Sequence, residues 1–222
     1  MNPPSSELGA QLITLCAALM LVFQLLLVVQ SMLLTSIRLF ALQSLMLTAI
    51  AATVAYFYNA EHVYIVALLT LLGKVIFLPW LLNRQVRRIN IVQELEPLLN
   101  APTSMLICGG LTLLGYVVAR PFTNLQKLGS NTLAVAFTLL LTGFFLMFNR
   151  RKAITQVLAL LTVENGVMLA AVALTTYGMP LVVEVGVFFD VTVAVMVLGI
   201  LVYRIRENFA SMDTSKLSHL KG

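Results

Sequence analysis

Residues 153–176 read AITQVLALLTVENGVMLAAVALTT, an apolar stretch with a single ionisable side chain, Glu164, near its centre. A hydrocarbon core about 30 Å thick is crossed by a helix of roughly 20 apolar residues, so this stretch predicts a transmembrane helix. A carboxyl at the middle of such a helix is unfavourable in lipid, which makes Glu164 a candidate functional residue.

The composition extends this prediction to the whole chain. Of 222 residues, 60% are hydrophobic and only 10% are charged, and the mean hydropathy is +0.97. A soluble domain carries about 25% charged residues, so a water-soluble globule is excluded. Strands of a membrane barrel alternate apolar and polar residues over about ten positions, whereas these blocks are continuously apolar. We therefore expect an all-α integral membrane protein without a soluble domain.

Polar and turn-forming residues divide the apolar sequence into seven predicted transmembrane helices. The first boundary is predicted near residues 35–38, because Thr35, Ser36 and Arg38 interrupt an apolar run too long for one span. Residues 84–102 form the long loop, which is either an interfacial helix or a solvated connector. The predicted helices cover residues 8–34, 36–58, 62–83, 103–119, 130–149, 153–176 and 181–203.

This pattern predicts three parts. Residues 1–102 form an N-terminal three-helix membrane unit with the cytoplasmic interfacial loop, residues 103–129 a spacer helix and outer loop, and residues 130–222 a three-helix unit with a cytoplasmic tail. Three glycines in the spacer helix, Gly109, Gly110 and Gly115, predict close packing against a neighbouring helix. Pro79 is expected to bend the third helix.

The positive charges predict the orientation, because short cytoplasmic loops collect Lys and Arg. With the N-terminus outside, only Arg120 and Lys127 fall in outer segments, and Lys74 falls inside a helix. The sequence therefore predicts an N-out, C-in topology. The other cations all fall in inner segments: Arg38, Arg84, Arg87, Arg88, Arg150, Arg151, Lys152, Arg204, Arg206, Lys216 and Lys221.

Four ionisable residues lie inside the predicted helices: Lys74, Glu164, Glu184 and Asp190. Each costs roughly 2.5–3.5 kcal/mol at the bilayer centre on insertion scales. Lys74, Glu164 and Asp190 are predicted at nearly the same depth, close to the midplane, whereas Glu184 lies about one turn from the outer end of its helix. We interpret these four residues as a lateral proton relay. The structural alternative is an ion pair of Lys74 with Glu164 or Asp190 that only holds helices together.

Polar residues near these charges favour local hydration. Thr162 and Asn165 accompany Glu164, Thr192 follows Asp190, and Thr70 precedes Lys74 by one turn. A wet path is predicted to extend through the first two helices at Gln24, Gln30, Gln43 and Ser44, although each of these residues taken singly is better interpreted as an interhelical hydrogen-bonding group.

No soluble enzyme chemistry is predicted. The chain has two histidines, His62 and His219, which lack a metal-ligand spacing, and it has no phosphate-binding loop or nucleophile motif. We therefore expect no catalytic residue, no metal and no bound cofactor in this chain.

Short motifs resemble known membrane families. A basic loop NRRK (149–152), a helix with VENG (163–166), a helix with FFDV (188–191) and the tail DTSKLSHLKG (213–222) resemble the NuoK subunit of complex I and the MrpC-type subunit of cation/proton antiporters. In that family the two central acids are proton-relay carboxylates, and by position they map to Glu164 and Asp190. Asp190 stands where Glu is usual, which shortens the reach of the carboxyl.

The chain as a whole is similar to the hydrogenase-4 component E family, through GKVIFLP (73–79), VENG (163–166) and VEVG (183–186). This resemblance implies a non-catalytic subunit in the membrane arm of a group 4 [NiFe] hydrogenase or formate hydrogenlyase, translocating protons or sodium. It also implies a multi-pass protein of the prokaryotic cytoplasmic membrane. The expected partners are lipid, antiporter-like and other membrane subunits, with a possible subunit contact for the cytoplasmic tail and no nucleic acid.

Three alternatives stay open at this stage. The first is a subunit of a multisubunit cation/proton antiporter or complex I-like assembly, against which the four extra N-terminal helices argue. The second is a purely structural membrane anchor. The third is an independent small-molecule transporter, against which the lack of paired broken helices argues.

Overall fold

The computed structural model describes residues 4–57, 61–89, 98–125, 131–150 and 153–174, and these residues are almost entirely helical. All of them belong to one unit, Met1–Glu184. Within them, six helices are long and apolar enough to cross a membrane. The predicted seventh helix, residues 181–203, lies outside the described residues.

The helices have the following bounds: α1 Pro4–Val29, α2 Leu33–Phe57, α3 Glu61–Thr70, the π-helix η1 Leu71–Phe77, α4 Leu78–Ile89, α5 Ala101–Ala119, the 3-10 helix η2 Arg120–Leu125, α6 Thr132–Asn149 and α7 Ala153–Leu174. The elements α3, η1 and α4 follow one another directly and together supply the third span. The long loop is therefore shorter than predicted, because helical structure continues from residue 84 to Ile89.

The first helix boundary was predicted too late in the sequence. α1 ends at Val29 and α2 begins at Leu33, so Arg38 lies inside α2 with an exposed side chain rather than in the connection. The short connection contains Gln30 and Ser31, two polar residues that lie inside the helix predicted over residues 8–34.

The π-helix η1 ends two residues before Pro79 and contains Lys74. Proline has no backbone N–H, so Pro79 cannot donate the usual bond to the carbonyl of Val75. The backbone N–H of Leu78 donates to the carbonyl of Gly73, five residues earlier, which is the wider spacing of a π turn. Such turns occur frequently at functional sites, and this one contains a buried cation, Lys74.

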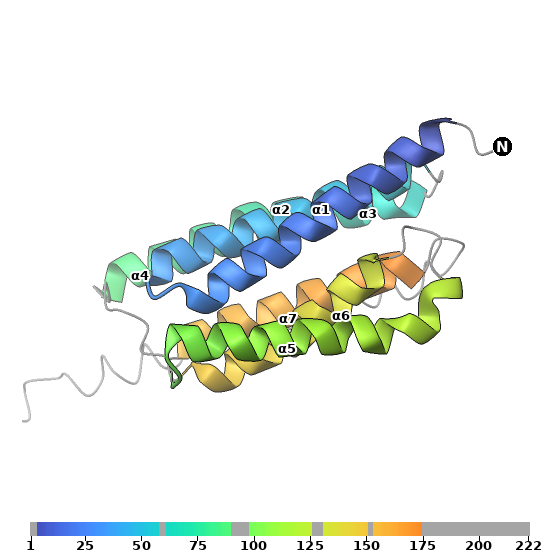
Figure 1. The fold of residues 1–222 in the computed structure, drawn as a ribbon. Coiled ribbons are helices and arrows are strands. Elements are labelled where there is room, and N and C mark those ends of the chain that lie inside the picture. The colour runs from blue at the N-terminus through green and yellow to red at the C-terminus, as the bar shows by residue number, and fades with distance from the viewer. Residues whose placement is uncertain (1–3, 58–60, 90–97, 126–130, 151–152, 175–222) are drawn as a thin grey trace, which may run out of the picture. The chain divides into compact units, whose positions relative to one another are not determined.

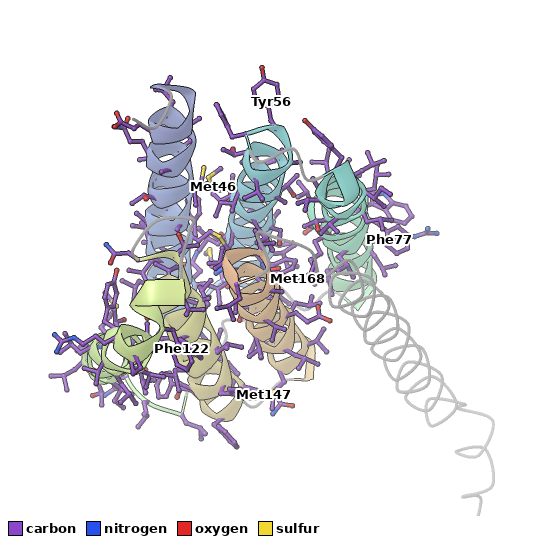
Figure 2. The ribbon with its side chains drawn as sticks, turned by 90° about the vertical axis from the view of Figure 1, so that its right-hand side faces the viewer. Met46, Tyr56, Phe77, Phe122, Met147 and Met168 are labelled. Atoms are coloured by element: carbon purple, nitrogen blue, oxygen red, sulfur yellow. The ribbon has the colours of Figure 1, made fainter. Side chains whose placement is uncertain are left out.

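The described helices form two rows (Figure 1). In the first row, α2 lies between α1 and the α3–η1–α4 segment; in the second, α6 lies between α5 and α7. The rows meet where α1 contacts α5 and α6 and where α2 contacts α7. Several large side chains point away from these contacts, including Phe77 on η1 and Tyr56 at the end of α2 (Figure 2).

Glycine packing in α5 agrees only in part with the sequence prediction. A Cβ atom added at Gly115 would lie 2.5 Å from Oγ1 of Thr138, so α5 and α6 approach closely at this point. Added Cβ atoms at Gly109 and Gly110 would meet nothing within 4 Å. The close packing predicted for all three glycines is therefore wrong for Gly109 and Gly110 as far as the described residues show.

Candidate functional site

Lys74 and Glu164 face each other between the two rows. Nζ of Lys74, on η1, lies 3.5 Å from Oε2 of Glu164, on α7, and both side chains are about 95% buried, with exposed fractions of 6% and 5%. Each residue lies near the middle of its candidate membrane span, Val63–Arg84 and Thr155–Leu174. Two residues that were selected from sequence for their similar depth are therefore in direct contact.

Asn165 connects this pair to α2. Its Oδ1 accepts a hydrogen bond from Nζ of Lys74 at 3.3 Å. Its Nδ2 donates to Oε1 of Gln43 at 3.1 Å and to Oγ of Ser44 at 3.0 Å. Both N–H groups of the Asn165 amide are thus used, and its side chain is completely buried.

Gln43 extends the hydrogen bonds to α1. Its Nε2 donates to Oε1 of Gln24 at 2.9 Å, and both glutamines have no exposed surface. The polar side chains of Glu164, Lys74, Asn165, Ser44, Gln43 and Gln24 therefore form one connected set, which we call the buried polar network. It includes residues from α1, α2, η1 and α7.

The network satisfies polar groups that lipid could not. A buried polar side chain without a partner is unfavourable by roughly 1–3 kcal/mol, and a buried charge without one by more. Interhelical hydrogen bonds join Gln24, Gln43, Ser44 and Asn165. For Gln24, Gln43 and Ser44, this is the role that the sequence favoured when each residue was considered singly. Chemically, the network places an ammonium and a carboxylate within reach of one proton transfer, surrounded by amides and a hydroxyl.

The other residues selected from sequence have different positions. Thr70 and Thr162 are buried, and the hydroxyl of Thr162 donates to the carbonyl of Ala159 in its own helix. Gln30 contributes its backbone carbonyl, described below, rather than a side-chain contact to the network. Glu184, Asp190 and Thr192 lie outside the described residues.

A second polar cluster surrounds Asn149 and Arg150, which were counted from sequence only as loop residues. The Arg150 side chain is 4% exposed, and its Nη2 donates to the carbonyls of Val28 at 3.1 Å and Gln30 at 2.8 Å. These carbonyls lie at the C-terminal end of α1, which attracts a cation through the helix dipole. Burial lowers the pKa of Arg150, because desolvation disfavours its charged form.

Asn149 fixes the beginning of α5 in the same cluster. Its backbone carbonyl accepts a hydrogen bond from the N–H of Leu98 at 2.9 Å. Its side-chain Oδ1 accepts one from the N–H of Leu99 at 3.0 Å. Its Nδ2 donates to Oγ of Ser104 at 3.2 Å. A count of loop charges cannot reveal such contacts.

No group of three His, Cys, Asp or Glu side chains that could hold a metal ion occurs in the described part of the chain. No protein-family profile matches the sequence, and no solved structure matches it. Curated proteins do match. The uncharacterized protein Rv0085 of Mycobacterium tuberculosis is 38% identical over 150 residues, which are 67% of this chain and 68% of that protein.

Hydrogenase-4 component E of Escherichia coli strain K12 is 29% identical over 217 residues, covering 96% of this chain and 99% of that protein. Hydrogenase-4 component E of Shigella flexneri matches equally well. The chain is homologous to hydrogenase-4 component E over almost its whole length. The sequence-based resemblance to this family is confirmed, and the shared region extends over nearly all of the predicted helices. The NuoK-like character of the last three helices stays a prediction.

Proposed function

We propose that this relative of hydrogenase-4 component E is a membrane subunit of a hydrogenase complex and contributes its buried Lys74–Glu164 pair to an intramembrane proton or sodium pathway. The observation that carries the proposal is the Lys74–Glu164 pair, 3.5 Å apart and buried near the middle of two candidate spans. The homology supports the hydrogenase complex, and the pair supports the pathway.

The pair holds a proton donor and a proton acceptor 3.5 Å apart. Transfer of one proton from Nζ of Lys74 to Oε2 of Glu164 converts an ammonium and a carboxylate into an amine and a carboxylic acid, with no change in net charge. In low dielectric the neutral and ionic forms are closer in free energy than in water, since desolvation disfavours both charges. A small change in a neighbouring charge can then move the proton.

The remaining relay residues belong to the same proposal. Asp190 would be the second relay carboxyl and Glu184 an outer exit, on a seventh helix over residues 181–203. The last three helices would resemble NuoK, and the chain would cross the membrane seven times with its N-terminus outside. Copurification with antiporter-like membrane subunits in mild detergent would support the proposed assembly.

Glu164→Gln tests the pathway. The substitution keeps the shape of the side chain and removes its ability to exchange a proton, so coupled ion pumping by the complex should fall at least tenfold while the complex still assembles. Thr162→Val, two residues before Glu164 on the same helix, is the matched control, because the hydroxyl of Thr162 donates to the carbonyl of Ala159 within α7. Normal pumping by Glu164→Gln would overturn the assignment.

The purely structural alternative makes the opposite prediction. If the ion pair only holds η1 against α7, then the double variant Lys74→Met with Glu164→Gln, which removes both charges, should assemble and pump normally. The proposed function requires that this variant assembles but does not pump.

A further inference from the structure

The three amides of the buried polar network all point the same way. Lys74 can only donate hydrogen bonds, so Asn165 must present Oδ1 to it and direct Nδ2 toward α2. Gln43 must then present Oε1 to Asn165 and direct Nε2 toward α1. Gln24 must in turn present Oε1 to Gln43. One ammonium group therefore fixes the orientation of three amides on three helices.

The amide of Gln24, at the α1 end of the row, is left with a donor unpaired in the described part of the chain as a result of this orientation. Nε2 of Gln24 is buried and has no hydrogen-bond partner among the described residues. Rotation of the Gln24 amide by 180° would not remove the problem, because it would place two donors, Nε2 of Gln24 and Nε2 of Gln43, against each other. The donor of Gln24 is thus held on the side away from Lys74 by the bonds that precede it.

An oriented row of amides is a poor conductor of protons. A proton arriving from the α1 side meets the N–H groups of Gln24, which have no lone pair to receive it. For a proton to pass along the row, each carbonyl oxygen would have to gain a proton and each NH₂ group lose one, which would leave every amide as an unfavourable imidic acid. The amides hold the network together without relaying.

The charge of Lys74 adds an electrostatic barrier. The ammonium form of Lys74 stands at the oxygen end of the row, so an excess proton moving from α1 toward the pair would approach a positive charge in low dielectric while Lys74 is protonated. Oriented hydrogen-bond donors combined with a fixed cation are a general means of excluding protons from a membrane path.

We propose that Gln24, Gln43 and Asn165 form a proton barrier that closes the α1 side of the Lys74–Glu164 pair, so that the pair exchanges protons only on its other side. This inference deepens the proposed function and rests on it for its physiological meaning. It assigns the three amides a role in keeping a proton path one-sided, because a path open in two lateral directions would dissipate the gradient that it serves.

The experiment replaces amides by groups of the same size that do relay protons. The hydrogenase complex is reconstituted into liposomes without substrate, and passive proton flux under a potassium diffusion potential is followed with an internal pH dye. The double variant Gln24→Glu with Gln43→Glu should raise this flux at least fivefold over the unsubstituted complex. Gln24→Met with Gln43→Met, which removes the same hydrogen bonds without adding a relay, should leave the flux at the unsubstituted level.

Each outcome decides the proposal. An unchanged flux in the double Glu variant, or an equal rise in the double Met variant, would overturn it, the latter because the amides would then act only by filling space. Gln43→His, whose two ring nitrogens can also pass a proton, provides a second relay should the double Glu variant fail to assemble. Normal pumping by Glu164→Gln would refute the proposed function but would not alter the passive flux, so the two failures can be distinguished.

Discussion

At the scale of single residues, Lys74 and Glu164 each depend on the other, because neither charge is stable alone in a buried site. We predict that Lys74→Met lowers the free energy of unfolding by about 3–5 kcal/mol, because it leaves the Glu164 carboxyl buried without its cation. The measurement is the unfolding transition of the purified protein in detergent.

The double variant Lys74→Met with Glu164→Gln tests whether the two residues are energetically coupled. It removes both charges, so it should recover at least half of the stability that Lys74→Met loses. Additive losses from the two substitutions would contradict the direct coupling that the 3.5 Å distance indicates.

Sequence patterns predicted how deep these residues lie in the membrane, but not which neighbouring helix each side chain faces. Counting residues from the ends of apolar blocks placed Lys74 and Glu164 near the midplane, because the rise of a helix is constant. It could not show that Lys74 and Glu164 contact each other, since the facing of two helices depends on their packing. It also could not show that Arg150 is buried, because residue type alone does not report burial.

At the scale of elements, the contact between α5 and α6 offers a prediction with an internal control. Gly115→Ala should destabilise the protein by about 1–3 kcal/mol, because the new Cβ would lie 2.5 Å from Oγ1 and 2.9 Å from the backbone N of Thr138. Gly109→Ala, in the same helix with nothing within 4 Å, should be neutral or stabilise by up to about 1 kcal/mol.

Thermal unfolding of the two glycine variants side by side is the measurement. If both lowered the midpoint equally, helix flexibility rather than the close approach at Gly115 would explain the glycines. If neither did, the packing of α5 against α6 would be looser than the structure shows.

The end of α1 depends on a cation from another element. Arg150→Met removes two hydrogen bonds to the carbonyls of Val28 and Gln30, and bonds to a charged group contribute about 1.5–3 kcal/mol each. We predict at least tenfold faster amide hydrogen exchange over residues 28–33. Arg38→Met, which removes an exposed cation from α2, should leave exchange in this segment unchanged.

Element boundaries were the least predictable part of the fold. Hydropathy places Gln30 and Ser31 in a helix, because two polar residues hardly change the average over a long apolar window. The observed break at this point is accompanied by the bonds from Arg150, a residue 120 positions away from Gln30. The π turn before Pro79 was likewise expected only as a bend, since sequence does not show which backbone bonds replace the one that proline removes.

At the scale of the whole molecule, the polar contacts between the two rows of described helices include contacts at two levels. The buried polar network joins η1, α2 and α1 to α7 near the middle of the spans, and Arg150 joins α6 to α1 at one end. Because lipid is as apolar as most side chains, hydrogen bonds and close packing are the main sources of specificity between membrane helices. These two levels therefore set how the rows align, and the network serves assembly as well as the proposed proton exchange.

The number of membrane crossings decides on which side of the membrane the C-terminus lies, and this side can be measured. With the predicted seventh helix over residues 181–203, the C-terminus lies on the same side as Arg150 and the opposite side from the N-terminus. Four cations follow that helix in the sequence, Arg204, Arg206, Lys216 and Lys221, which favours a cytoplasmic end. A fluorescent protein that folds only in the cytoplasm, fused after Gly222, should therefore fluoresce, and alkaline phosphatase fused there should be inactive.

Fusion after Tyr177 is the matched control, because it follows α7 but precedes the predicted seventh helix. Its behaviour should be reversed, with active phosphatase and no fluorescence. Identical behaviour at the two fusion points would mean that residues 181–203 do not cross the bilayer. Asp190 would then not lie at the depth of Lys74 and Glu164, and the proposed relay would have to reach the membrane surface without a second carboxyl from this chain.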